Sequence, residues 1–389
     1  VKRQNESTTR YLEALPERGW FLDTMQRVMG QPRAGVPFKR AGHYFVSRND
    51  GGQNQDVIFV APSLAELSDG GRVLIDPNTF AIDGTSSLTS LTVSGDGRLV
   101  AYGLSEAGSD WTTFRLLDLA SGEPKDDALI QTKFSQAEWL ADHRSYVYTH
   151  FDHVGDADGT QTTALFGPKL RIHRIGESQD HDELILAFPE NDQLMFWGEV
   201  TDDDRYLIVS ITEGTENRNR LWAYSIIAGE RSSLGSPIKI IDEAIAEFAL
   251  AGSRGATLYL RTDLEAEAGR LIAVDLDDFA DSGQLRWQEL VAENDHTLYD
   301  AQAAGDGFIL VYLADALPLI VEVDLDGGSP RTVEITGGAV VGLNAKSEDQ
   351  EAFIGVSSVT APTHSYLIDT RSATASSLGG LVKRGPDTF

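Results

Sequence analysis

The stretch VTDDDRYLIVSITEGTENRNRLWAYSII, from Val200 to Ile227, contains the unit on which the whole fold is built. A polar turn leads into an alternating apolar strand, and a second turn leads into another strand of the same kind. Alternation of apolar and polar residues over about four to eight positions is typical of a half-buried β-strand. Asp, Asn and Gly are the residues that tight turns favour. The stretch therefore predicts two antiparallel strands.

This unit recurs about seven times along the chain. Its first half returns as VSGDGRLVAYGLS from Val93, WLADHRSYVYTHF from Trp139 and AAGDGFILVYLAD from Ala303. A unit of several short strands that repeats at a spacing of roughly 40 to 60 residues is typical of β-propeller blades. One blade cannot cover both faces of its sheet, so its neighbours must supply the apolar surface. We expect an all-β fold, a seven-bladed β-propeller with a short helical N-terminal lead-in.

The two ends of the chain lack this repeat. Residues 1–38 carry apolar residues at helical spacing, interrupted at Pro16, which predicts two short helices. Residues 39–372 form the expected propeller. Residues 373–389 have lost the pattern and are rich in Gly, so we interpret them as a linker that leaves the domain.

Composition excludes several classes of function. The 389 residues carry a formal net charge of -28 and no cluster of Lys or Arg, so we expect neither nucleic acid nor a membrane surface as a partner. The chain has no cysteine, which excludes disulfides, thiolate metal sites and a cysteine nucleophile. The acidity favours solubility, and attraction of cationic peptides is the alternative.

Motifs that carry chemistry are missing from the sequence. It contains no Gly-x-Ser-x-Gly, no HExxH and no Gly-rich phosphate loop, so we expect no catalytic residue, metal or cofactor in this chain. Two acidic stretches, residues 150–160 and 178–184, lack a full set of metal ligands and are interpreted as an exposed loop and a solvated turn. The run Asp202 to Asp204 is interpreted in the same way, as turn chemistry.

Several longer stretches follow one another in a specific order. They are GGQNQ from Gly51, DPNTFAIDGTSSL from Asp76, AYGLSEAGSDW from Ala101, TKFSQAEW from Thr132, GTQTTALF from Gly159 and GTENRNRLW from Gly214. Together they resemble the propeller of the prolyl oligopeptidase family of serine peptidases, and the resemblance covers nearly the whole chain. AYGLSEAGSDW and GTENRNRLW are its most specific parts.

The resemblance implies a propeller inserted into an α/β-hydrolase domain, whose Ser-Asp-His triad cleaves short peptides after proline. Residues 1–38 are similar to the part of the hydrolase that precedes the propeller, and residues 373–389 would lead toward the hydrolase domain that this chain lacks. The implied function is that of a non-catalytic propeller that gates and selects substrates for a prolyl endopeptidase, and we expect this chain to be inactive by itself.

Two other functions remain open at this point. The alternative is a free-standing propeller that acts as a scaffold for binding peptides or proteins. A self-contained propeller enzyme is the third hypothesis. It would need inward metal ligands or a cofactor-stacking Trp on several blades, and the sequence shows no such repeated placement.

The resemblance also implies candidate substrate-binding residues. Phe134 matches an aromatic residue that lines the pocket for the substrate residue two positions before the scissile bond, and Met195 matches another apolar wall residue. Thr215 stands at a pocket position that holds Cys or Thr in the family. Thr212 stands where some members carry a substrate-contacting arginine, so the resemblance does not imply a cationic substrate contact at this position. Asp110 is expected at the interface with the hydrolase domain.

The expected partners are a C-terminal α/β-hydrolase domain of the same polypeptide and short proline-containing peptides. We expect a monomer and a bacterial type of enzyme, located in the cytoplasm or the periplasm. The resemblance implies that no shared strand locks the first blade to the last, and no strand from the lead-in clearly completes the last blade here.

Overall fold

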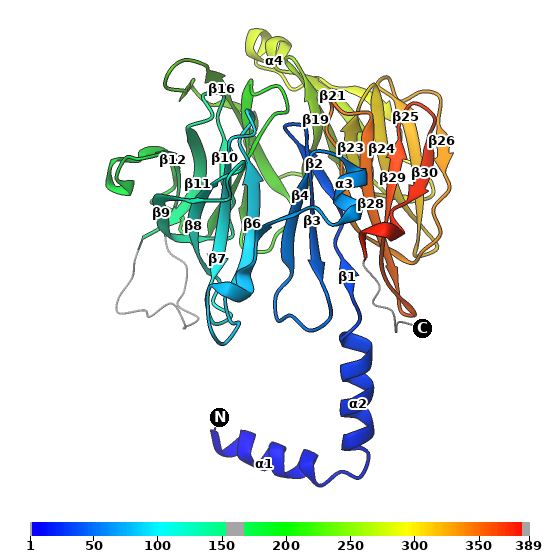
Figure 1. Ribbon diagram of the computed structural model, residues 1–389. Helices are drawn as coiled ribbons and strands as arrows, with labels where there is room; N and C mark the ends of the chain where they lie inside the picture. The colour runs from blue at the N-terminus through cyan, green and yellow to red at the C-terminus, as the bar shows by residue number, and fades with distance from the viewer. Residues whose placement is uncertain (1, 153–166, 383–389) are drawn as a thin grey trace.

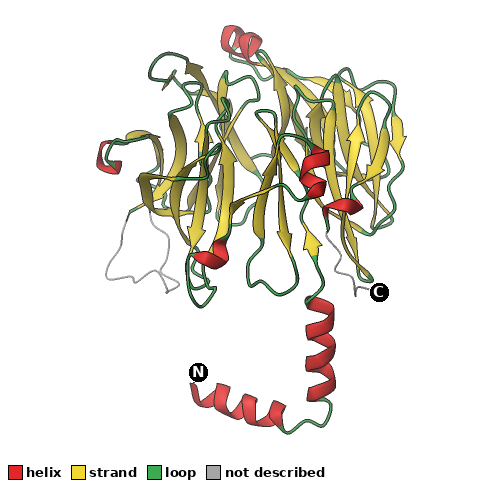
Figure 2. Ribbon diagram, in the orientation of Figure 1, coloured by secondary structure: helices red, strands yellow, loops and turns green. Residues whose placement is uncertain are grey.

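The strands of this chain form a ring of antiparallel sheets, and two helices extend from one end of the ring (Figure 1). The computed structural model describes residues 2–152 and 167–382. The predicted pair of helices is confirmed as α1 (Lys2–Glu13) and α2 (Arg18–Met29). Strands make up nearly all of the rest (Figure 2).

The first three sheets follow the order of the chain. The first contains β1 (Arg33–Ala34), β2 (Phe38–Arg40), β3 (His43–Asn49), β4 (Val57–Ala61) and β5 (Arg72–Ile75). The second contains β6 (Ser87–Val93), β7 (Leu99–Ser105), β8 (Trp111–Asp118), β9 (Pro124–Lys133), β10 (Glu138–Trp139), β11 (Ser145–Phe151), β12 (Pro168–Arg174) and β13 (Glu183–Ala187). The third contains β14 (Leu194–Val200), β15 (Tyr206–Glu213), β16 (Asn219–Ile227), β17 (Ser233–Leu234) and β18 (Ile238–Ile241).

The last three sheets have four strands each. The fourth contains β19 (Phe248–Arg254), β20 (Thr257–Thr262), β21 (Arg270–Asp275) and β22 (Gln288–Val291). The fifth contains β23 (Thr297–Ala304), β24 (Gly307–Ala314), β25 (Leu317–Asp324) and β26 (Arg331–Val333). The sixth contains β27 (Ala339–Asn344), β28 (Glu351–Ser358), β29 (Ala361–Asp369) and β30 (Thr374–Ser377). The short helices are α3 (Leu64–Asp69), α4 (Leu276–Ser282), η1 (Pro77–Thr79), η2 (Gln179–His181) and η3 (Gly379–Leu381).

The all-β propeller is therefore present, but the expected seven separate blades are wrong. Hydrogen bonds divide the described strands into six sheets. The second sheet has eight strands because β9 pairs with β8 on one side and, through Thr132 and His150, with β11 on the other. Sequence repeats show where strands recur, but they do not show where one long strand continues the hydrogen bonding into the next unit.

A buried histidine reinforces this joined sheet. The imidazole of His173 on β12 lies 2.8 Å from Asp182 through Nδ1 and 3.1 Å from Asp127, at β9, through Nε2. All three side chains are almost completely buried. Burial lowers the pKa of His173, but the two carboxylates outweigh that effect and raise it to about 9. The imidazolium thus links β9 to the β12–β13 hairpin.

The apolar core lies between neighbouring sheets. Leu140 and Val147 of the second sheet pack with Phe196, Leu207 and Val209 of the third, for example. Similar clusters join the first sheet to the second, the third to the fourth, the fourth to the fifth and the fifth to the sixth. Stability is therefore shared around the ring, as expected when no single unit can bury its own faces.

The ring closes without a shared strand. In the described residues the first sheet is built only of β1–β5 and the last only of β27–β30. Side-chain contacts join them instead. Lys39 contacts Asp349 and Glu351, and the ring of Tyr44 meets Phe353 edge-on. This seam depends on polar contacts and packing rather than on a hydrogen-bonded ladder.

Helices α1 and α2 bury none of their residues against the ring. Large apolar side chains are exposed on the two helices and on the turn between them: Tyr11, Leu12, Leu15, Trp20, Phe21, Leu22, Met25, Val28 and Met29. Exposed apolar side chains gathered on two adjoining helices make this a candidate binding surface. Among the described residues no helix is long and apolar enough to cross a membrane.

Candidate functional site

The candidate functional site is a pair of adjoining cavities inside the ring, lined mainly by the first strand of successive sheets and called the tunnel below. A lower cavity of about 720 Å³ is lined by the N-terminal parts of β6, β14 and β19, and an upper cavity of about 530 Å³ by their C-terminal parts. On β6, for example, Ser90 lines the lower cavity and Thr92 the upper one. The two cavities share wall residues, so they follow one another along the axis of the ring.

The lower cavity lies toward the end of the ring that carries α2. Strand β6, whose N-terminal part lines this cavity, follows the loop that contains Gly84. The carbonyl oxygen of Gly84 accepts a hydrogen bond from Gln55 at 3.1 Å. The loop that holds Gln55 also contains Gly51, which contacts Gly30 at the end of α2. The upper cavity, by contrast, is lined by Arg40 of β2, at the opposite end (Figure 1).

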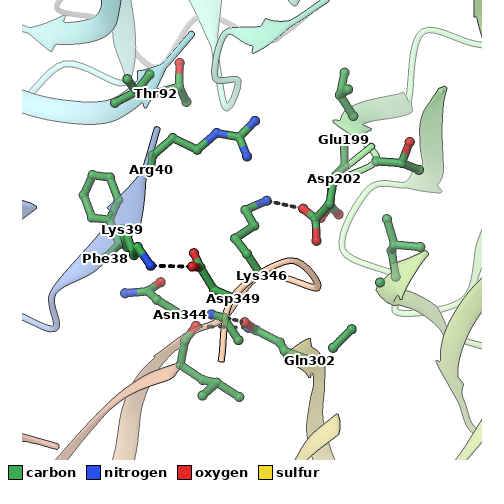
Figure 3. A pocket seen from close by; sticks show the side chains of 18 of the residues that line it. Phe38, Lys39, Arg40, Thr92, Glu199, Asp202, Gln302, Asn344, Lys346 and Asp349 are labelled. Atoms are coloured by element: carbon green, nitrogen blue, oxygen red, sulfur yellow. Dashed lines mark hydrogen bonds and ion pairs between the residues drawn. The ribbon is translucent and has the colours of Figure 1, made fainter. Parts of the chain in front are cut away.

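The wall of the upper cavity is strongly charged, as Figure 3 shows. Its ionisable lining residues are Lys39, Arg40, Glu138, Glu199, Asp202, Asp300, Lys346, Asp349 and Glu351. Lys39 pairs with Asp349 at 2.5 Å, and Lys346 pairs with Asp202 at 2.6 Å. Carboxylates outnumber cations in this wall, in keeping with the net charge of the chain.

Two carboxyl groups mark the junction of the cavities, because Glu138 and Glu199 line both. Glu138 accepts hydrogen bonds from Gln136 at 2.5 Å and from the backbone amide of Val200 at 3.3 Å. Although the side chain of Glu199 is open to the tunnel, its position deep inside the ring raises its pKa to about 7, and the negative charge of Glu138 adds to this effect. Burial also raises the pKa of Glu138.

The lower cavity contains two of the five predicted site residues, Phe134 and Asp110. Between them lies the buried ammonium group of Lys133, 3.2 Å from Asp110 Oδ2 and over the rings of Phe134 and Trp111, at 5.2 and 5.4 Å from their centroids. The side chain of Asp110 is 63% exposed, and Phe134 is 49% exposed. The structure thus presents an aromatic face and a carboxylate together at this cavity.

The other three predicted residues lie outside the lining of both cavities. Met195 on β14 and Thr212 on β15 face one another as paired strand positions, and Thr215 lies in the exposed turn that follows. The hydroxyl of Thr212 is buried and has no hydrogen-bond partner among the described residues. The structure therefore groups Met195 with Thr212, apart from Phe134 and Asp110.

Several tunnel residues were not predicted from the sequence. The run from Asp202 predicts only a turn, yet Asp202 contacts Lys346 in the loop between β27 and β28 of a distant sheet. The stretch 178–184 is not simply a solvated turn, because Asp182 is buried against His173. The acidic stretch 150–160 lies mostly outside the described residues. Among the described residues no group of three or more His, Cys, Asp or Glu is placed to hold a metal ion.

Comparison with known proteins matches nearly the whole chain. The family described as "Prolyl oligopeptidase, N-terminal beta-propeller domain" matches residues 1–378. Two curated relatives are prolyl endopeptidases, one from Elizabethkingia meningoseptica and one from Elizabethkingia miricola. They are 28% and 29% identical to this chain, over 93% of its length and 50% of their own. The chain thus spans about half the length of these curated relatives.

Solved structures agree with this match. A structure from a study of two prolyl endopeptidases superposes with a TM-score of 0.80 at 28% identity, over 97% of this chain and 52% of its own. Prolyl oligopeptidase B from Galerina marginata, bound to a 25mer macrocyclization substrate, has a TM-score of 0.86 at 20% identity, over 96% and 54%, and shows the shared fold. The chain belongs to the family of N-terminal β-propeller domains of prolyl oligopeptidases.

Proposed function

We propose that this chain is the non-catalytic, substrate-selecting part of a prolyl endopeptidase that cleaves short peptides after proline. In this proposal the Ser-Asp-His triad belongs to a C-terminal α/β-hydrolase domain of the same polypeptide. The observation that carries the proposal is the tunnel. A ring of packed sheets admits a flexible peptide but excludes a folded protein, and it keeps the adjoining active site partly dry, which strengthens electrostatic interactions there.

The exposed helices support a hydrolase partner on the lower face. Helices α1 and α2 extend beyond the ring at the end to which the lower cavity belongs (Figure 1), and they expose large apolar side chains. A domain that covers these helices would also cover the mouth of the lower cavity. Asp110 would then stand at the interface, where an arginine of the hydrolase domain is a suitable partner for its exposed carboxylate.

An assay with peptides of increasing length tests this proposal. The protein encoded by the complete gene should cleave a short reporter peptide after an internal proline and should leave the same sequence intact within a folded protein. The 389-residue chain by itself should give no hydrolysis. Absence of turnover by the complete protein, together with peptide binding, would favour the free-standing scaffold instead. Cleavage by the isolated chain would contradict the proposal directly.

Replacement of Phe134 with alanine should weaken substrate binding. We expect the lost aromatic contact to weaken binding by about 1.4 kcal/mol, which corresponds to a rise in KM of about tenfold. The contact is made equally in the ground state and the transition state, so kcat should be nearly unchanged. Steady-state kinetics with a proline reporter peptide measures both constants. The matched control is Phe80→Ala, because Phe80 is similarly exposed at 45% but lines neither cavity. An equal effect of both substitutions would remove Phe134 from the binding site.

A further inference from the structure

One loop of the sixth sheet reaches to a sheet that is not its neighbour in the ring. Residues 345–350 connect β27 to β28, and Asp202 lies in the turn between β14 and β15 of the third sheet. Lys346 Nζ lies 2.6 Å from Asp202 Oδ1. The backbone amide and hydroxyl of Ser347 donate to Asp202 Oδ2 at 2.9 and 2.6 Å. The Lys346–Asp202 pair is drawn across the upper cavity in Figure 3.

The same loop is held at the seam where the ring closes. Asp349 accepts a hydrogen bond from Lys39 of the first sheet at 2.5 Å, and Glu348 lies 3.7 Å from Arg40. Residues 345–350 are therefore bound on two sides, by the first sheet and by the third. Because the first and sixth sheets share no strand among the described residues, these ionic contacts connect the least constrained part of the ring to its opposite wall.

The cross-tunnel pair is charged on both sides. Burial lowers the pKa of Lys346, but the charge of Asp202 outweighs it and the pKa is raised. Burial raises the pKa of Asp202, but Lys346 and Ser347 outweigh it and the pKa is lowered. The Asp202 side chain is 13% exposed and that of Lys346 is 35% exposed. Dissolved salt therefore weakens the attraction between them, but by less than it weakens a fully exposed pair.

We propose that Asp202 and Lys346 form an ionic latch that closes the tunnel at the end remote from α1 and α2. The latch consists of Asp202, Lys346 and Ser347. While it is closed, the third and sixth sheets are tied together across the axis, and the seam beside the first sheet cannot widen freely. Its consequence for peptides rests on the proposed gating function: a peptide enters the tunnel from this end only while the latch is open.

Distance measurements on the chain test the latch without any peptidase assay. The sequence has no cysteine, so two introduced cysteines can be spin-labelled without background. Arg231→Cys on the third sheet and Arg371→Cys on the sixth suit this purpose, because their side chains are 64% and 72% exposed. Pulsed electron paramagnetic resonance then gives the distribution of distances between the two sheets.

We expect one narrow distribution for the parent chain at low salt. Lys346→Gln should add a second population at longer distance, and salt near 1 M, where the Debye length is about 3 Å, should have a similar but smaller effect. The charge swap Asp202→Lys with Lys346→Asp should restore the narrow distribution. The control is Lys239→Gln, which removes an exposed pair with Asp242 on the third sheet.

Two results would overturn the latch. One is a distribution that neither Lys346→Gln nor salt changes. The other is a broadened distribution that the charge swap leaves broadened. Circular dichroism establishes that each variant is folded, and Ser347→Ala, which removes only one hydroxyl contact, provides a milder variant should Lys346→Gln unfold. The distances are independent of hydrolysis, so failure of the latch and failure of the peptidase proposal are separate outcomes.

Discussion

Replacing His173 with alanine is expected to lower the free energy of unfolding by about 3–5 kcal/mol. The substitution removes the imidazolium between Asp127 and Asp182 and leaves two buried carboxylates facing an empty space. Asp182 also accepts a hydrogen bond from Tyr148 at 2.6 Å, so the loss extends to a neighbouring strand. Equilibrium urea unfolding, followed by tryptophan fluorescence, measures the effect. The damage should be local to the joined second sheet.

The free energy of unfolding should depend on pH differently in the parent chain and in His173→Ala. The folded pKa of His173, about 9, lies above the ordinary value of 6.5 that applies to the unfolded chain. Its stabilising effect is therefore complete below about pH 6.5 and is lost as the pH rises through 9. The difference in unfolding free energy between the parent and His173→Ala should shrink by about 3 kcal/mol from pH 6 to pH 10, since each unit of pKa difference is worth about 1.4 kcal/mol.

His181→Ala is the matched control. His181 belongs to the short helix η2 that precedes β13, and its side chain is exposed. Its replacement should change stability by no more than about 0.5 kcal/mol at any pH. Equal destabilisation by both substitutions, or a difference for His173→Ala that stays constant between pH 6 and pH 10, would show that the imidazolium does not link these strands.

Replacing Asn219 with alanine should cost about 2–4 kcal/mol. The buried Asn219 amide donates to Ser210 Oγ at 2.7 Å and to the carbonyl oxygen of Phe248 at 2.9 Å. Its side-chain oxygen accepts from the backbone amide of Phe248 at 2.8 Å. Alanine leaves both backbone groups of Phe248 buried without these partners, and each such group costs about 1–3 kcal/mol. Thermal and urea unfolding both measure the loss.

Asn191→Ala is the control for this prediction. On the surface beside the same third sheet, the Asn191 side chain donates to Glu213 at 3.2 Å and accepts from the backbone amide of Gln193 at 3.1 Å, and both contacts are exposed to solvent. Asn191→Ala should change the free energy of unfolding by no more than about 0.5 kcal/mol. Asn219 lies within one of the two most specific family stretches, GTENRNRLW, so a small effect there would mean that this stretch does not serve to hold the third sheet to the fourth.

Much of the architecture could be predicted from local sequence. The alternation of Tyr206 to Thr212 predicts a strand, and that segment is part of β15. Pro16 and the helical spacing around it predict two helices, and α1 and α2 end and begin on either side of it. These features depend on residues a few positions apart, where steric preference and burial of one face determine the outcome.

The number of separate sheets and the composition of the tunnel could not be predicted in this way. The joining of β9 to β11 rests on the pairing of Thr132 with His150, and repeat spacing gives no information about a register between units. Asp182 has the local sequence of a solvated turn, yet it is buried because His173 from another strand compensates its charge. Burial of a charge depends on a partner that sequence proximity does not reveal.

The sequence by itself determined the ring of antiparallel strands, the helical lead-in and, through its longer motifs, the family. Only the tertiary structure decided which side chains meet in the tunnel: Phe134 beside Lys133, Glu138 beside Glu199, and Lys346 across from Asp202. The physical reason is range. Strand propensity and turn chemistry act between adjacent residues, whereas the last of these contacts joins residues 144 positions apart that only closure of the ring brings within hydrogen-bonding distance.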